Sequence, residues 1–198
     1  VPTAVWLGKA FYGIDIREYG SGNAGATNTF RVLGTKAGVT VFLIDFLKGF
    51  TAASLVHFFG TIEYSSIRWV NIQLLFGIAA VFGHIFPIFA NFKGGKGIAT
   101  LFGMVVAIHY LPALLCAALF IIILLSTRYV SLSSITAVVF FPLLLVFVFQ
   151  EDAKLLIAFG ITAAIMVILT HQKNIKRLLE GEENKANILR KHRRDRNS

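Results

Sequence analysis

Seven apolar segments, separated by short polar stretches, constrain what this chain can fold into. They cover residues 1–13, 37–60, 70–90, 98–110, 111–127, 135–149 and 153–170. A helix needs about 20 apolar residues to cross about 30 Å of hydrocarbon, so these lengths are typical of membrane helices. The alternating ten-residue strands of an outer-membrane barrel are absent from the sequence. We therefore predict an all-α, polytopic membrane bundle of about seven helices, folded as one domain.

The composition also favours a membrane protein. Hydrophobic residues make up 56% of the 198 residues and charged residues only 15%, whereas a soluble domain has roughly 25% charged residues. Cys116 is the only cysteine and lies in an apolar segment, so a disulfide framework is excluded and a buried, unreactive thiol is expected. His57, His84 and His109 lie on apolar segments without carboxylate or cysteine partners at ligand spacing, so we expect no metal site.

Two segments depart from the usual span length. Residues 98–127 form a 30-residue apolar stretch that Pro112 divides, which predicts two short helices or a kinked hairpin. Residues 1–13 amount to about half a bilayer crossing, and Val1 is not a methionine. We therefore expect a first helix that has lost its N-terminal half.

The distribution of basic residues predicts the orientation. Loops 14–36, 91–97 and 128–134, together with the tail 171–198, carry fifteen lysines and arginines. The opposite loops, 61–69 and 150–154, carry only two. Because cytoplasmic loops are enriched in Lys and Arg, the basic side is expected to face the cytosol. A basic tail beside a membrane fits this role better than nucleic-acid binding.

The first polar loop is rich in small and hydrogen-bonding residues. It runs from Arg17 to Arg31 and contains Ser21, Asn23, Thr27 and Asn28 among glycines and alanines. Small residues let the backbone curl around a ligand, and successive N–H groups can bind an anion. The arginines could add forked donors for a phosphate or a carboxylate.

A glycine-rich turn precedes the fourth apolar segment. It consists of Lys93, Gly94, Gly95, Lys96 and Gly97. Exposed backbone N–H groups at a helix start, together with two lysines, favour an anion, so this turn is a candidate phosphate site. It is not a Walker A loop, and the alternative is a plain basic turn that flanks the membrane.

Three further groups of polar residues have two interpretations each. Ser131, Ser133 and Ser134 are either site residues or helix caps. His171 and Asn174, three residues apart, share a helix face at the membrane surface, where His171 could be a base, a ligand donor or an anchor. Asp45 and Lys48, also three apart, favour a structural ion pair over direct catalysis.

No activated nucleophile is visible in the sequence. It contains neither a Gly-x-Ser-x-Gly elbow nor the His/Asp box of acyltransferases. Several cationic and glycine-rich elements nevertheless gather on one face. Such a site suits two phosphate-bearing substrates, one of which is already chemically activated.

Three motifs in this order resemble the bacterial PlsY family of acyl-phosphate:glycerol-3-phosphate acyltransferases. They are Gly20–Asn28, Lys93–Gly97 with Ala99 and Thr100, and the pattern from His171 and Asn174 through Gly181 to Glu183. The segments Arg128–Ser134 and Asp45–Gly49 also fit the family pattern. The resemblance extends from the first residues to about Glu183.

The resemblance implies an enzyme that makes 1-acyl-glycerol 3-phosphate from glycerol 3-phosphate and an acyl phosphate, without a cofactor. It implies catalytic roles for Ser21, His171 and Asn174. It also implies a structural role for Glu183, beside the pair Asp45 and Lys48. The expected substrate-binding residues are Asn23, Thr27, Asn28, Arg31, Lys93, Gly94, Gly95, Lys96, Gly97 and Ser134.

The same resemblance sets the expected location and partners. Residues 1–170 would form the transmembrane acyltransferase domain, and residues 171–198 a cytosolic motif with a basic tail. The enzyme would lie in the bacterial cytoplasmic (inner) membrane with its active site facing the cytosol. The lipid bilayer is an expected partner, and the soluble enzyme that makes acyl phosphate is a candidate one. No nucleic-acid partner is expected.

Two other functions remain open on the sequence alone. Charges within the second segment and a broken fourth segment would suit a transporter of a phosphorylated metabolite, but the motif residues cluster at one membrane face. An acyl-CoA-dependent acyltransferase is disfavoured by the missing His/Asp box. For the proposed reaction, the base could be His171 or a phosphate oxygen of the donor.

Overall fold

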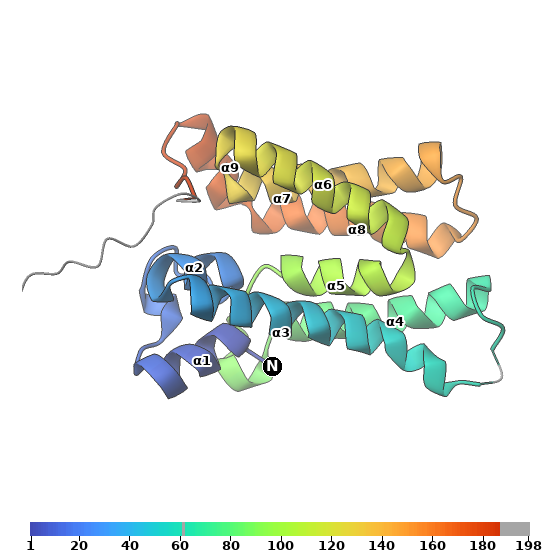
Figure 1. Ribbon diagram of the computed structural model, residues 1–198, viewed down its shortest axis with the longest axis horizontal. Helices are drawn as coiled ribbons and strands as arrows, with labels where there is room; N and C mark the ends of the chain where they lie inside the picture. The colour runs from blue at the N-terminus through green and yellow to red at the C-terminus, as the bar shows by residue number, and fades with distance from the viewer. Residues whose placement is uncertain (61, 187–198) are drawn as a thin grey trace, which may run out of the picture.

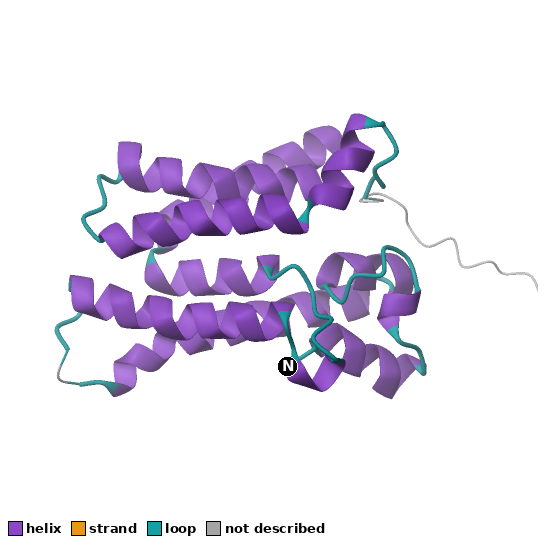
Figure 2. Ribbon diagram, turned by 180° about the vertical axis from the view of Figure 1, so that it is seen from behind, coloured by secondary structure: helices purple, strands orange, loops and turns teal. Residues whose placement is uncertain are grey.

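The computed structural model describes residues 1–60 and 62–186, and the regular elements in these ranges are all helical (Figure 2). The α-helices are α1 (Thr3–Tyr12), α2 (Ala26–Leu33), α3 (Thr35–Ser54), α4 (Ile67–Ile85), α5 (Ile98–Ile108), α6 (Tyr110–Thr127), α7 (Val130–Leu143), α8 (Lys154–Thr170) and α9 (Gln172–Leu179). Short 3-10 turns are η1 (Ile16–Glu18), η2 (Leu55–Phe58) and η3 (Ile88–Ala90), and η4 (Leu144–Val148) is a π-helical turn. The end of the predicted basic tail, residues 187–198, lies outside the described residues.

The helices form two groups with α5 between them. Both views show α1 to α4 on one side of α5 and α6 to α9 on the other (Figures 1 and 2). Within this arrangement α3 packs against α5, and α7 packs against both α6 and α8. The polar segments around α2 and α9 gather at one end of the bundle, and the connections from α3 to α4 and from α7 to α8 lie at the other (Figure 1).

The lengths of the helices confirm a membrane bundle. Four stretches are long and apolar enough to cross a bilayer: Thr35–Phe58, Ile67–Ala90, Tyr110–Thr127 and Val130–Val148. Helices α8 and α9 meet that criterion only together, across a bend of 63°. Because α9 is strongly basic, the apolar crossing ends with α8 at Thr170. Helices α1 and α5, with 10 and 11 residues, are each about 16 Å long, which is half of a bilayer core.

Glycines hold the short helix α5 against α3. A methyl group on Gly49 of α3 would overlap the carbonyl oxygen of Thr100, and one on Gly103 of α5 would overlap that of Phe46. Only glycine permits such close backbone approach between helices in a membrane. This contact fixes the start of α5, and with it the glycine-rich turn that precedes the helix.

The structure corrects three details of the sequence-based prediction. The break in the apolar stretch 98–127 falls at His109, and Pro112 lies in the first turn of α6, where its missing N–H costs nothing. Most of the predicted loop 128–134 is the first turn of α7, whose start follows Arg128 in a left-handed conformation. The predicted loop 14–36 contains η1, α2 and the first residues of α3.

Candidate active site

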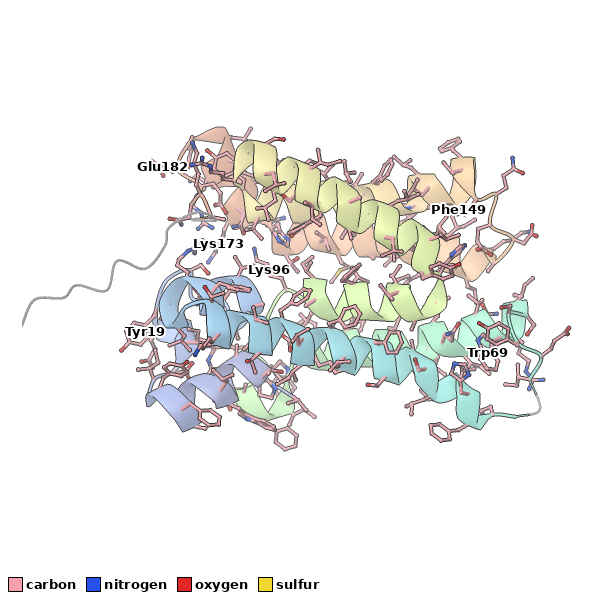
Figure 3. The ribbon with its side chains drawn as sticks, in the orientation of Figure 1. Tyr19, Trp69, Lys96, Phe149, Lys173 and Glu182 are labelled. Carbon is pink, nitrogen blue, oxygen red and sulfur yellow. The ribbon has the colours of Figure 1, made fainter. Side chains whose placement is uncertain are left out.

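A polar cavity of about 360 Å³ lies at the end of the bundle that carries α2 and α9. Its polar lining draws on every motif that the sequence singled out and also includes His84. The polar residues are Ser21, Asn23, Thr27, Asn28, Arg31, Asp45, His84, Lys96, Ser131, Ser134, Thr170, His171, Gln172, Lys173, Asn174 and Arg177. Lys96 and Lys173 mark this end of the molecule, whereas Trp69 and Phe149 mark the opposite end (Figure 3). The fold therefore gathers residues from both halves of the chain around one space.

Asn28 organises the first polar loop. It is 1% exposed, and its Nδ2 donates hydrogen bonds to the carbonyl oxygens of Ile16 and Tyr19, each at 3.0 Å. Its Oδ1 accepts a hydrogen bond of 2.9 Å from the backbone N–H of Ser21. A methyl group on Gly20 would overlap that same oxygen, and Gly20 has a φ of 62°. The Asn28 amide thus holds the loop that presents Ser21 at the cavity.

Arg17 links the first loop to the second. Its guanidinium donates to the Asp15 carboxylate, with Nε–Oδ1 at 2.9 Å and Nη2–Oδ2 at 2.6 Å. Its Nη1 donates to the carbonyl oxygen of Ala90 at 2.8 Å. These bonds from Arg17 hold the pKa of Asp15 well below its usual range. Arg17 does not line this cavity but a separate cleft, so of the two arginines that could bind a phosphate only Arg31 reaches the polar cavity.

The glycine-rich turn presents only part of its predicted set to the cavity. Lys96 and Gly97 line it, whereas Lys93 and Gly94 line a separate cleft beside Arg17. A methyl group on Gly94 would overlap the His84 carbonyl oxygen, and Gly97 begins α5 with a φ of 80°. The glycines therefore let this turn pack closely against the end of α4, and the Lys96 side chain lies in the polar cavity.

Lys96 is the first member of a hydrogen-bonded chain that crosses the cavity wall. Its Nζ donates to Oδ1 of Asn174, and Asn174 Nδ2 donates to Glu183 Oε1 at 2.7 Å. Glu183 also accepts from Arg177 Nε at 2.7 Å and from Ser131 Oγ at 2.9 Å. With both amide groups engaged, the orientation of Asn174 is fixed.

Burial and charge set the ionisation of this chain. Burial lowers the pKa of Lys96 to about 8, and the nearby Glu183 carboxylate partly offsets it. Burial alone would raise the pKa of Glu183, but hydrogen bonds from Arg177, Asn174 and Ser131 outweigh it and hold that pKa below its usual value. At neutral pH the cavity therefore holds a cationic Lys96, and an anionic Glu183 lies behind the wall, beyond Asn174.

His171 follows the last residue of α8 and lines the same cavity. Its Nδ1 lies 2.8 Å from the carbonyl oxygen of Val167. Because that oxygen can only accept, Nδ1 carries the proton and Nε2 keeps a lone pair. Burial, followed by the charge of Lys96, lowers the pKa of His171 to about 4. His171 is therefore a neutral hydrogen-bond acceptor at physiological pH and a weak base.

An apolar cavity of about 280 Å³ adjoins the polar one. The two share Phe42, Ile98, Phe120 and Ser134 in their walls. The apolar cavity continues between α3, α5, α6, α7 and α8, and Cys116 lies in its lining. The site thus combines a cationic, hydrogen-bonding compartment with a hydrocarbon-like compartment, which is the division that an amphiphilic ligand requires.

The pair Asp45 and Lys48 forms as its spacing predicts, with 2.6 Å between Lys48 Nζ and Asp45 Oδ1. The sequence analysis missed their third partner. His84 on α4 has its Nδ1 2.6 Å from Lys48 Nζ and 3.6 Å from Asp45 Oδ1. No carboxylate stands at ligand spacing from His84 in the sequence, and tertiary packing supplies these neighbours by bringing α4 beside α3. Arg177 was also missed as a cavity residue, and only its place within a predicted motif hinted at it. Ser131, for which the sequence left a site role open, lines the cavity.

The residues that the sequence predicted at or near the site fall into three groups. Those that line the polar cavity are Ser21, Asn23, Thr27, Asn28, Arg31, Lys96, Gly97, Ser134, His171 and Asn174, together with Asp45. Lys48 and Glu183 lie one contact behind the wall, bonded to Asp45 and Asn174 respectively. Lys93, Gly94 and Gly95 do not line the polar cavity.

Comparison with known proteins gives a consistent result. A family model described as glycerol-3-phosphate acyltransferase matches residues 1–181. A glycerol-3-phosphate acyltransferase of Chlorobium phaeovibrioides is 42% identical, over 97% of this chain and 93% of its own. One from Salinibacter ruber is 44% identical, over 92% of this chain and 85% of its own.

Solved structures agree with the sequence comparisons. The chain is similar to a crystal structure of PlsY, an integral membrane glycerol 3-phosphate acyltransferase, in its glycerol 3-phosphate form. The TM-score is 0.79 and the identity 38%, over 93% of this chain and 90% of that one. It is similarly close to the lysophosphatidic acid form of PlsY, with a TM-score of 0.78 and 38% identity, over 92% of this chain and 87% of that one.

Proposed function

The chain belongs to the glycerol-3-phosphate acyltransferase family, and we propose that its acyl donor is an acyl phosphate. The hydroxyl at carbon 1 of glycerol 3-phosphate would attack the acyl carbonyl carbon. The bond from that carbon to the phosphate oxygen would break, leaving 1-acyl-glycerol 3-phosphate, or lysophosphatidate, and inorganic phosphate. The PlsY structures in glycerol 3-phosphate and lysophosphatidic acid forms support this acceptor and this product.

The observation that carries the proposal is a cationic cavity that continues into an apolar one. The phosphate groups of both substrates would stay in the polar compartment, and the acyl chain would extend between α5, α6 and α7. Lys96 and the backbone at the start of α5 would bind the acceptor phosphate, because a phosphate there gains both charge and N–H donors. Arg31 and Ser21, which are exposed in the cavity, would bind the donor phosphate.

The absence of a paired nucleophile within residues 1–60 and 62–186 supports direct transfer. Of the cavity serines Ser21, Ser131 and Ser134, Ser131 donates to Glu183, while His171 bonds to backbone and to Thr170, so these contacts include no Ser–His pair. Cys116 lies in the apolar cavity away from any base. An acyl phosphate is a mixed anhydride with phosphate as its leaving group, so no acyl-enzyme is needed.

His171 and Asn174 would position the acceptor. The Nε2 lone pair of neutral His171 would accept a hydrogen bond from a glycerol hydroxyl, and Asn174 would fix the Lys96 ammonium. Because His171 is a weak base, the hydroxyl proton would pass to a phosphate oxygen of the donor, which leaves with it. The protein would therefore contribute mainly binding, orientation and charge.

The charge asymmetry supports a cytosolic site in a bacterial cytoplasmic membrane. The cavity lies at the end of the bundle that carries Arg17, Arg31, Lys96 and Arg128, as expected for a cytoplasmic face. Glycerol 3-phosphate and a soluble enzyme that supplies acyl phosphate would both reach this face directly.

Purified protein in lipid vesicles tests the proposed donor. Long-chain acyl phosphate and glycerol 3-phosphate should yield lysophosphatidate and stoichiometric phosphate, and Lys96→Ala should abolish the reaction or raise the acceptor KM. Acyl-CoA and acyl carrier protein thioester serve as matched alternative donors. Turnover with either thioester at a rate equal to that with acyl phosphate would reject the assigned donor.

A further inference from the structure

A buried polar cluster forms part of the wall of the polar cavity and is not explained by the acyl-transfer site alone. It consists of Asp45 and Lys48 on α3, His84 on α4, and Thr3 on α1. Thr3 Oγ1 donates to Asp45 Oδ1 at 2.8 Å, and Lys48 Nζ donates to the same oxygen at 2.6 Å. His84 is 5% exposed and lines the cavity, as does Asp45.

The contacts of His84 define its tautomer. Its Nδ1 lies 2.6 Å from Lys48 Nζ. An ammonium group has three donors and no acceptor, so Nδ1 must accept, and the proton of a neutral imidazole is then on Nε2. Asp45 does not compete for Nδ1, because its nearest oxygen is 3.6 Å away and already accepts from Thr3 and Lys48.

The Nε2–H faces the turn that carries Lys96. A methyl group on Gly95 would overlap Nε2 of His84, so the edge of the ring lies directly against the backbone next to Lys96. In the described parts of the chain, no hydrogen bond joins Nε2 to another protein group. Because His84 also lines the polar cavity, a polar donor is held at the cavity wall beside the turn that carries Lys96.

We propose that His84 is a substrate-binding residue that donates from Nε2 to a phosphate oxygen of glycerol 3-phosphate. A phosphate monoester offers only acceptors to this donor, and the neutral imidazole adds directional binding to the charge of Lys96. Asp45 and Lys48 act as positioning residues, because Lys48 fixes the tautomer and Asp45 holds Lys48. The inference rests on the proposed function in one respect, namely that Lys96 binds the acceptor phosphate.

Two isosteric substitutions separate this role from a purely structural brace between α3 and α4. In His84→Gln the side-chain amide reaches the position of Nε2 and keeps a donor at the cavity. In His84→Asn the amide occupies the position of Nδ1, so it retains a partner for Lys48 but loses the donor. Steady-state kinetics of each variant, reconstituted in vesicles, would be measured with the two substrates varied separately.

A lost hydrogen bond to a charged group corresponds to a roughly 10- to 150-fold loss of affinity. We expect the acceptor KM to rise by that factor in His84→Asn, with the KM for acyl phosphate and kcat nearly unchanged. His84→Gln should stay much closer to wild type. His57→Asn, which changes an exposed histidine at the opposite end of the bundle, is the matched control.

Parallel measurements on Lys96→Ala separate the two proposals. If Lys96→Ala raises the acceptor KM and His84→Asn does not, the role of His84 is wrong and the phosphate site stands. If Lys96→Ala leaves it unchanged, the assigned phosphate site is wrong. An equal rise of the acceptor KM in His84→Asn and His84→Gln would show that His84 only braces α3 against α4, and would overturn the proposal.

Wild-type protein with ¹⁵N-labelled histidine keeps the proposal testable should the variants fail to fold. Glycerol 3-phosphate should shift one Nε2–H resonance and slow the exchange of that proton with water, whereas glycerol, which lacks the phosphate, should not. The absence of any glycerol 3-phosphate-dependent change at a histidine Nε2–H would contradict the proposal.

Discussion

Replacing Lys96 with arginine should extend the pH range over which the enzyme captures glycerol 3-phosphate. Burial lowers the pKa of Lys96 to about 8, so its charged form is lost as the pH rises through that value. An arginine at the same position stays charged, because its pKa exceeds about 12. The acceptor phosphate is a dianion above about pH 6, so wild-type binding should be strongest between the two values.

The expected size of the effect follows from the protonated fraction of Lys96. With a pKa of about 8, that fraction falls from about 0.9 at pH 7 to about 0.1 at pH 9. A charge-assisted hydrogen bond is worth about 1.5–3 kcal/mol, so the neutral form binds phosphate roughly 10- to 150-fold more weakly. Wild-type kcat/KM for the acceptor should therefore drop about five- to ninefold between these pH values, while kcat changes less because bound phosphate keeps Lys96 charged.

The assay is initial-rate release of phosphate at saturating acyl phosphate, corrected for spontaneous hydrolysis at each pH. The ratio of kcat/KM at pH 9 to that at pH 7 is calculated within each variant. Any loss of affinity that the arginine side chain causes at both pH values then cancels in the ratio. Lys93→Arg is the matched control, since Lys93 lies in the same turn but outside the cavity, and it should keep the wild-type profile. An alkaline decline that is equally steep in Lys96→Arg would refute the reasoning.

Substitutions at three further residues give distinct expected outcomes. Glu183→Gln should lower the free energy of unfolding by about 1.5–3 kcal/mol at pH 7, since it weakens charged hydrogen bonds. Because folding depresses the pKa of the Glu183 carboxyl, the stability advantage of the wild type should fade as the pH falls below about 4, which thermal melts of both proteins would show. Cys116→Ala should keep near-normal turnover, and Cys116→Phe should shift the donor preference toward shorter chains by filling the apolar cavity; a trapped acyl-thioester in wild type would instead implicate the thiol. His171→Ala should raise the acceptor KM with an unchanged kcat pH profile, whereas a loss of roughly 10²–10⁴ in kcat with an altered profile would identify it as the general base.

The sequence alone predicted the membrane class and the position of the site, because both depend on local patterns. Apolar segment length indicated the helices, and glycines next to basic residues indicated the turn at Lys96. The break between α5 and α6 was located three residues too far along, at Pro112 instead of His109. A proline is tolerated in the first turn of a helix, so it marks a helix start as readily as a break.

Side-chain partners that depend on tertiary packing could not be predicted in this way. Lys93 and Lys96 are equivalent in composition, and only the contact of the turn with α4 decides which one enters the cavity. Arg17 carries the charge of a phosphate ligand but is engaged by Asp15 and a backbone carbonyl. His84 gains its partners from α3, nearly forty positions earlier in the chain.

Two-substrate kinetics test the central claim, direct transfer from acyl phosphate, most directly. Purified enzyme would be assayed with glycerol 3-phosphate varied at several fixed concentrations of acyl phosphate. Direct transfer requires both substrates in the adjoining cavities at once, so the double-reciprocal lines should intersect. Parallel lines, together with phosphate release in the absence of acceptor, would reveal an acyl-enzyme and contradict the account.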